Sequence, residues 1–120
     1  MLKYQATVSA VGPMVDEFLN EGVVVLFSDR APEELREFAI LHDGTTLSAP
    51  IIPGDWVVFD HERYRVLAVG AVANSNLSNL GHLVMKCNGL SEPDMPGDIC
   101  VESKSLPKIR VGSVLRIEGA

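Results

Sequence analysis

The sequence lacks the features that mark membrane, nucleic-acid-binding and disulfide-rich proteins. Its longest uninterrupted apolar run, residues 23–27, is far shorter than the roughly 20 residues that span a bilayer. Lysine and arginine form no cluster, and the net charge of −6 argues against a nucleic-acid partner while favouring encounter with a basic protein surface. The only cysteines, Cys87 and Cys100, have no metal-ligand spacing. We interpret them as buried reduced thiols.

The chain also has few aromatic residues, and its first residues do not resemble a leader sequence. Met1, Leu2 and Lys3 run directly into an alternating strand pattern, so no signal peptide is expected and the predicted location is cytoplasmic. Its 120 residues, of which 47% are hydrophobic and 22% charged, suit a single domain over residues 1–120. Because only 6% of the residues are aromatic, we expect an aliphatic core.

Most of the periodic segments predict strands. In residues 3–10, Tyr4, Ala6 and Val8 alternate with polar residues such as Lys3, which is typical of a half-buried strand with Lys3 facing outward. Residues 56–59 and 64–69 flank a polar turn and predict a hairpin. Further strands are expected at residues 23–27, 40–42, 82–87, 99–102 and 114–118.

Helical signals are brief. Residues 14–20 predict a short helix, residues 28–39 one or two helical turns, and residues 74–80 irregular structure or a single turn. About eight strands with so little helix indicate an all-β fold, and no βαβ crossover is visible. The favoured architecture is a small closed or nearly closed β-barrel with one or two short helices, ahead of a sandwich.

Three histidines are the main candidates for chemistry, because the chain has no phosphate-binding glycine loop and no recognisable nucleophile motif. His61 lies at a hairpin tip and is expected to be solvated. His82 shares the outer face of its strand with Val84. His42 ends an apolar strand and is followed at once by an Asp-Gly turn, which predicts an imidazole held at the rim of the core. A metal site built from all three histidines is not favoured.

Four blocks of the sequence carry a family resemblance. They are APEELREFAILH at residues 31–42, RYRVLAVG at residues 63–70, NLSNLGH at residues 76–82 and GSVLRIE at residues 112–118. In this order and spacing, and over essentially the whole chain, they resemble the glucitol/sorbitol-specific enzyme IIA of the bacterial phosphoenolpyruvate-dependent sugar phosphotransferase system.

The resemblance implies a phosphocarrier with a small Greek-key β-barrel fold. Such a protein accepts a phosphoryl group on a histidine from phospho-HPr and passes it to a cysteine of the IIB component, while the IIC component carries the sugar alcohol across the membrane. The accepting histidine of the family falls on His42, and His82 falls beside the site. The chain would then act as a cytoplasmic histidine phosphotransferase that associates transiently with the transporter, with no cofactor, no metal and no direct sugar binding.

A histidine suits this chemistry because neutral imidazole has a free lone pair near pH 7, its ordinary pKa being about 6.5. The other ring nitrogen must carry hydrogen and be held, by a backbone carbonyl or by a carboxylate such as Asp43. Phosphoryl oxygens would be stabilised at Asp43, Gly44 and Thr45, or by His82. The partner must reach His42, so we expect an exposed ring in a shallow apolar patch bordered by residues such as Ile51.

The main alternative is a non-catalytic β-barrel module that binds a ligand or a protein. The resemblance weighs against it, and phosphorylation by HPr would exclude it.

Overall fold

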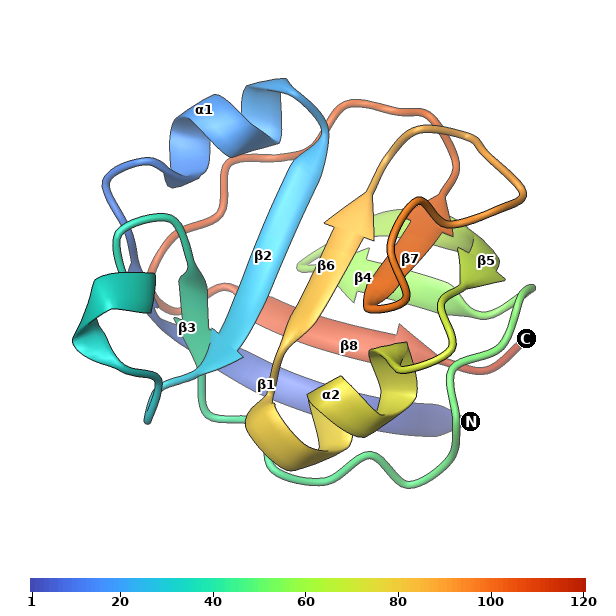
Figure 1. Cartoon of the computed structure of the whole chain (residues 1–120), viewed down its shortest axis with the longest axis horizontal. Helices are drawn as coiled ribbons and strands as arrows, with labels where there is room; N and C mark the ends of the chain where they lie inside the picture. The colour runs from blue at the N-terminus through green and yellow to red at the C-terminus, as the bar shows by residue number, and fades with distance from the viewer.

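A computed structural model of the protein describes all 120 residues. Eight strands form a closed barrel in the order β1-β3-β2-β6-β7-β5-β4-β8, and the two termini lie on the same side of it (Figure 1). The strands are β1 Leu2–Val11, β2 Val23–Ser28, β3 Ile40–His42, β4 Trp56–Phe59, β5 Glu62–Val69, β6 Leu83–Lys86, β7 Asp98–Val101 and β8 Val114–Glu118. The helices are α1 Val15–Asn20 and α2 Ala73–Leu80, with a 3₁₀ turn η1 at Glu33–Leu35. None of them is long and apolar enough to cross a membrane.

The all-β barrel prediction is confirmed, but the pairing of its strands is not wholly antiparallel. β2 pairs with β3 in parallel, and so does β6 with β7, whereas the other six pairs are antiparallel. The connections within the two parallel pairs are loops, one of which contains η1. A crossover without a true helix leaves no periodic signal, which is why the parallel pairs were not anticipated.

One of the two helical segments outside α1 agrees with its prediction and the other is longer than predicted. Residues 28–39 contain the single turn η1, which follows Pro32 and lies within the one or two turns predicted. Residues 73–80 form two full turns of α-helix rather than one. That helix, α2, lies across the front of the barrel in Figure 1 and leads directly into β6.

The inward face of β1 follows the predicted alternation, with one exception at its start. Tyr4, Ala6 and Val8 are buried in the core. Lys3, expected to face outward into water, is only 7% exposed, so that prediction was wrong. Its Nζ lies 2.6 Å from Oδ2 of the buried Asp55 and donates to the carbonyl of Pro50, so these two contacts join residues 50–55 to β1.

Strand β3 is buried on both faces. Ile40 packs in the main core, and Leu41 packs outside the barrel with Val25, Ala31 and Ala39. Because side chains alternate along a strand, His42 points to the same side as Ile40. The fold therefore directs the His42 side chain toward the barrel interior.

Candidate functional site

His42 lies at the end of β3, between β1 and β2. Its backbone pairs with Val8 and Ser28, and its carbonyl accepts the N–H of Asp29. The side chain is 0% exposed. The rigid placement expected for this residue is present, but the expected exposure of the ring is wrong. The two-residue period of β3 carries the imidazole inward with Ile40 rather than out to the rim.

The apolar border expected around an exposed ring is absent for the same reason. Ile40 and Ile51 are each 1% exposed and belong to the main core, and Leu47 packs against that core. No apolar patch of these residues frames His42 on the surface.

Both ring nitrogens of His42 are hydrogen-bonded. The N–H of Gly44 donates to Nδ1 at 3.0 Å, and Nε2 lies 2.8 Å from the carbonyl oxygen of Gly81. A backbone N–H can only donate and a carbonyl can only accept, so we assign the hydrogen to Nε2 and the lone pair to Nδ1. Of the two predicted ways to hold the ring, the structure uses a backbone carbonyl, and Asp43 does not hold it.

Gly81 places that carbonyl where the ring needs it. It ends α2 in the left-handed conformation, with φ of 62°, and a Cβ at this position would lie 2.8 Å from the backbone nitrogen of Ser28. Only glycine combines this conformation with so close an approach to β2. The sequence signal for this role is the glycine that directly follows the 74–80 segment, and the sequence analysis assigned it no function.

Burial lowers the pKa of His42 below its ordinary value of 6.5. The hydrogen bond to the Gly81 carbonyl and the charges of Asp43 and Asp29 act in the opposite direction but are smaller effects. The imidazole is therefore neutral near pH 7. A neutral ring with its hydrogen fixed on Nε2 keeps a lone pair on Nδ1.

The three residues after His42 form an exposed segment with distinct contacts. The Asp43 carboxylate accepts the N–H of Thr7 at 2.8 Å, and the Asp43 N–H donates to the Thr7 carbonyl. Gly44 bonds the ring. Thr45 is exposed, its backbone N–H makes no hydrogen bond within the protein, and its hydroxyl lies 3.4 Å from that of Thr46.

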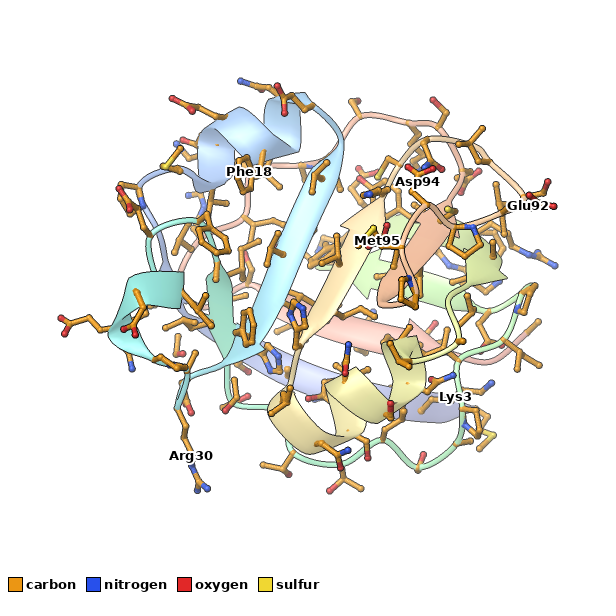
Figure 2. All side chains as sticks on the ribbon, in the orientation of Figure 1. Lys3, Phe18, Arg30, Glu92, Asp94 and Met95 are labelled. Atoms are coloured by element: carbon orange, nitrogen blue, oxygen red, sulfur yellow. The ribbon has the colours of Figure 1, made fainter.

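A hollow of about 490 Å³ opens beside His42. Its wall includes both residues that bond the ring, Gly44 and Gly81, although His42 itself does not line it. The ring therefore lies immediately behind the wall of the hollow. Arg30, which the sequence analysis did not single out, is the only cationic residue of the lining and projects away from the barrel in Figure 2.

His82 is on the outer face of the barrel, as predicted. Its ring stacks on Phe27 at a centroid distance of 4.0 Å, and its Nδ1 lies 3.1 Å from the carbonyl oxygen of Leu26. A carbonyl can only accept, so Nδ1 carries the hydrogen and Nε2 the lone pair. His82 is half-buried, and its Nε2 makes no hydrogen bond.

The third histidine and the metal-binding question are simpler. His61 is exposed in the turn between β4 and β5, as predicted. No group of three or more histidine, cysteine or acidic residues is arranged so that it could hold a metal ion. The structure thus brings His42 and His82 to either side of Gly81 and leaves His61 apart from them.

Known proteins are similar to this chain in sequence and in fold. The family model described as the PTS system glucitol/sorbitol-specific IIA component matches residues 3–116. Two proteins named PTS system glucitol/sorbitol-specific EIIA component, from Shigella flexneri and Escherichia coli (strain K12), are each 34% identical over 115 residues, which is 96% of this chain and 94% of theirs.

A solved structure agrees at the level of the fold. The crystal structure of a PTS system IIA component from Enterococcus faecalis V583 matches with a TM-score of 0.78 and 23% identity, covering 92% of this chain and 96% of that one. The match of the family model over nearly all residues, and the identity to full-length relatives, decide the family. The chain belongs to the glucitol/sorbitol-specific IIA components of the sugar phosphotransferase system.

Proposed function

We propose that this protein is a phosphocarrier that accepts a phosphoryl group from phospho-HPr on a histidine and passes it to the cysteine of a IIB component. The relatives are named as glucitol/sorbitol-specific, and we extend that substrate class to this chain. The sugar alcohol itself is handled by the membrane transporter, with which the protein associates transiently. The net charge of −6 favours encounter with a basic partner surface and raises the rate of association more than the affinity.

We propose His42 as the acceptor, through Nδ1. The observation that carries this assignment is a neutral imidazole with its hydrogen held on Nε2 by Gly81, behind the wall of the hollow of about 490 Å³. In the transfer, the Nδ1 lone pair attacks phosphorus in line with the bond to the donor ring. The donor N–P bond breaks, and its electron pair returns to the donor imidazole. Since both carriers are histidines, we expect the step to be nearly thermoneutral and reversible.

The burial of the ring imposes a condition on this step. The Gly44 N–H occupies the Nδ1 lone pair, so residues 43–45 must shift before phosphorus can approach. The segment borders two hollows, of about 490 and 280 Å³, and both of its end residues are exposed. Once displaced, the N–H groups of Gly44 and Thr45 become donors for phosphoryl oxygens, so the segment that covers the nucleophile also stabilises the product.

His82 is the second candidate acceptor, and its accessibility favours it. Its Nε2 lone pair is unpaired and its ring is half-buried, so attack needs no movement of the backbone. The two candidates predict different chemical products. Phosphorylation of His42 would occur on Nδ1, because Nε2 of that ring carries the hydrogen bonded to Gly81. Phosphorylation of His82 would occur on Nε2, because Nδ1 of that ring carries the hydrogen bonded to Leu26.

The experiment is phosphorylation with phosphoenolpyruvate, enzyme I and HPr, followed by NMR assignment of the phosphohistidine isomer in the unaltered protein. We expect one acid-labile, base-stable phosphoryl group per chain, on Nδ1. His42→Gln should be unlabelled while retaining its circular dichroism spectrum, and His61→Gln, altered at the exposed turn, should label normally. An Nε2 isomer that disappears in His82→Gln would move the acceptor to His82. An unlabelled wild-type protein would refute the phosphocarrier function and favour a non-catalytic module.

A further inference from the structure

The hydroxyl of Tyr4 is buried without a hydrogen-bond partner. Tyr4 is 2% exposed, and its Oη makes no hydrogen bond. The other buried side-chain oxygen that lacks a hydrogen bond, Oδ2 of Asp98, lies 2.7 Å from Nζ of Lys86 and so has an ionic partner. Tyr4 alone has neither. Buried hydroxyl groups in native proteins normally have a hydrogen-bond partner, so one without a partner requires an explanation. One explanation is that the partner is a ligand that binds later.

The orphan hydroxyl lies beside Gly44, the residue whose N–H covers Nδ1 of His42. The Tyr4 ring meets the His42 ring edge-on, with a centroid distance of 5.9 Å and an interplanar angle of 82°. A Cβ added to Gly44 would lie 2.5 Å from Oη of Tyr4, so the hydroxyl sits against the residue whose N–H bonds Nδ1. Tyr4, Gly44 and Thr45 also line the same hollow, of about 280 Å³.

We propose that Tyr4 is a catalytic residue of phosphoryl transfer, whose hydroxyl donates a hydrogen bond to an oxygen of the phosphoryl group on Nδ1 of His42. The inference rests on the proposed function and on His42 as the acceptor. Displacement of residues 43–45 moves Gly44 away from both the hydroxyl and the nitrogen, and the phosphoryl group enters the space that this residue leaves.

The chemistry requires a hydroxyl that donates and does not ionise. Burial, followed by the charge of Asp43, raises the pKa of Tyr4 to about 12, so the hydroxyl keeps its proton near pH 7. The N–P bond to Nδ1 forms as the donor N–P bond breaks, the electron pair goes to the donor ring, and Tyr4 transfers no proton. A fixed donor in a water-poor site acts on the charge that the transferring oxygens carry.

The fold offers a matched control. Tyr64 is also fully buried in the same core, but its hydroxyl donates to the carbonyl of Ser105 at 2.8 Å. Tyr64 lines neither of the two hollows at the site. Tyr4→Phe and Tyr64→Phe each delete one buried hydroxyl. The first removes an orphan at the site, and the second removes a bonded group elsewhere.

The experiment compares the rates of phosphorylation by phospho-HPr and the ³¹P resonance of the phosphohistidine. We expect Tyr4→Phe to melt at or above the wild-type temperature and to shift the ³¹P resonance. We also expect it to be phosphorylated about 100-fold more slowly, which is the lower end of the effect of deleting one donor to a developing oxyanion. Tyr64→Phe should melt at a lower temperature but keep the wild-type rate and resonance.

Each other outcome has a definite meaning. A wild-type rate and an unchanged resonance in Tyr4→Phe overturn the inference. If that variant is also less stable, the hydroxyl instead binds a buried water. Phosphorylation of the wild-type protein on Nε2 of His82 overturns the role of Tyr4 but leaves the phosphocarrier function intact, whereas a wild-type protein that is never phosphorylated overturns the function itself.

Discussion

Replacement of Gly81 by alanine tests whether the hydrogen bond that fixes the His42 ring depends on the backbone geometry at the end of α2. The residue has φ of 62°, and an alanine Cβ would lie 2.8 Å from the backbone nitrogen of Ser28 and 3.0 Å from its Cα. Both contact atoms belong to β2, which is paired on both sides and cannot easily yield. The substitution therefore adds a conformational cost and a steric cost.

The two costs can be separated with a control. A left-handed conformation costs a non-glycine residue about 1–2 kcal/mol, and an unaccommodated contact in packed structure adds about 1–3 kcal/mol. Gly112 has φ of 94° but nothing within 4 Å of its would-be Cβ. Gly112→Ala should therefore lose only the first amount, and Gly81→Ala about 2–5 kcal/mol in all.

Urea unfolding followed by circular dichroism measures both variants. For a domain of this size, the expected losses of unfolding free energy correspond to melting temperatures lowered by about 8–20 °C in Gly81→Ala and by about 4–8 °C in Gly112→Ala. Gly81→Ala should also be phosphorylated more slowly, since its shifted carbonyl no longer holds Nε2 of His42. If Gly81→Ala is no less stable than Gly112→Ala, or is phosphorylated at the wild-type rate, the reasoning about this contact is refuted.

Three further predictions concern the buried Asp55 and His42 and the half-buried Cys87. Asp55→Asn should lower the free energy of unfolding by about 3–5 kcal/mol, because it leaves the Lys3 ammonium buried without its counter-charge. In urea unfolding, the double variant Lys3→Met/Asp55→Leu should recover much of that loss. If the losses from changing the two residues simply add, the prediction is contradicted. Because the pKa of His42 is lowered by folding, the unfolded chain binds a proton at this residue more tightly than the folded protein does. The contribution of neutral His42 to stability is therefore fully present above about pH 6.5 and is lost as the pH falls toward the folded-state pKa. His42→Gln should lose stability less steeply than the wild type below about pH 6.5, and an identical slope would argue against this prediction. Burial raises the pKa of the Cys87 thiol to about 11, so iodoacetamide should alkylate the native protein at pH 7.5 far more slowly than the urea-unfolded chain, and equal rates would disprove this.

The fold was predictable because its strands carry local signals. Residues 40–42 and 114–118 were predicted with the bounds that the structure has, and the hairpin of β4 and β5 followed from its polar turn. The position of Lys3 was not predictable in this way. Its partner Asp55 is 52 residues away, and a charge that is buried by a distant counter-charge looks in sequence like any outward-facing lysine.

The site was predictable only in part, for a comparable reason. The resemblance pointed to His42, and the strand pattern placed it at the end of β3. A strand of three residues, however, shows too little alternation to reveal which face is covered, and the covers are loop residues whose placement has no sequence signal. Residues 31–39 cover the outer face of β3, while Gly44 and Gly81 close off the ring itself. The orphan hydroxyl of Tyr4 has no sequence signal, because Tyr4 occupies an ordinary core position of an alternating strand.

The burial of His42 affects both the protonation of its ring and the access of other molecules to Nδ1. An exposed imidazole would react with any phosphoryl donor that reached it, and its charge would vary with pH near its ordinary pKa. A buried ring with a lowered pKa is neutral throughout the range near pH 7, and its tautomer is set by Gly81 rather than by solvent. The Nδ1 lone pair is then available near pH 7, and access to it depends on residues 43–45, whose two end residues are exposed. If His42 is the acceptor that we propose, selectivity for a phosphoryl donor depends on the contact that displaces this segment, and we expect a partner to be recognised by the surface around the hollow as well as by the histidine.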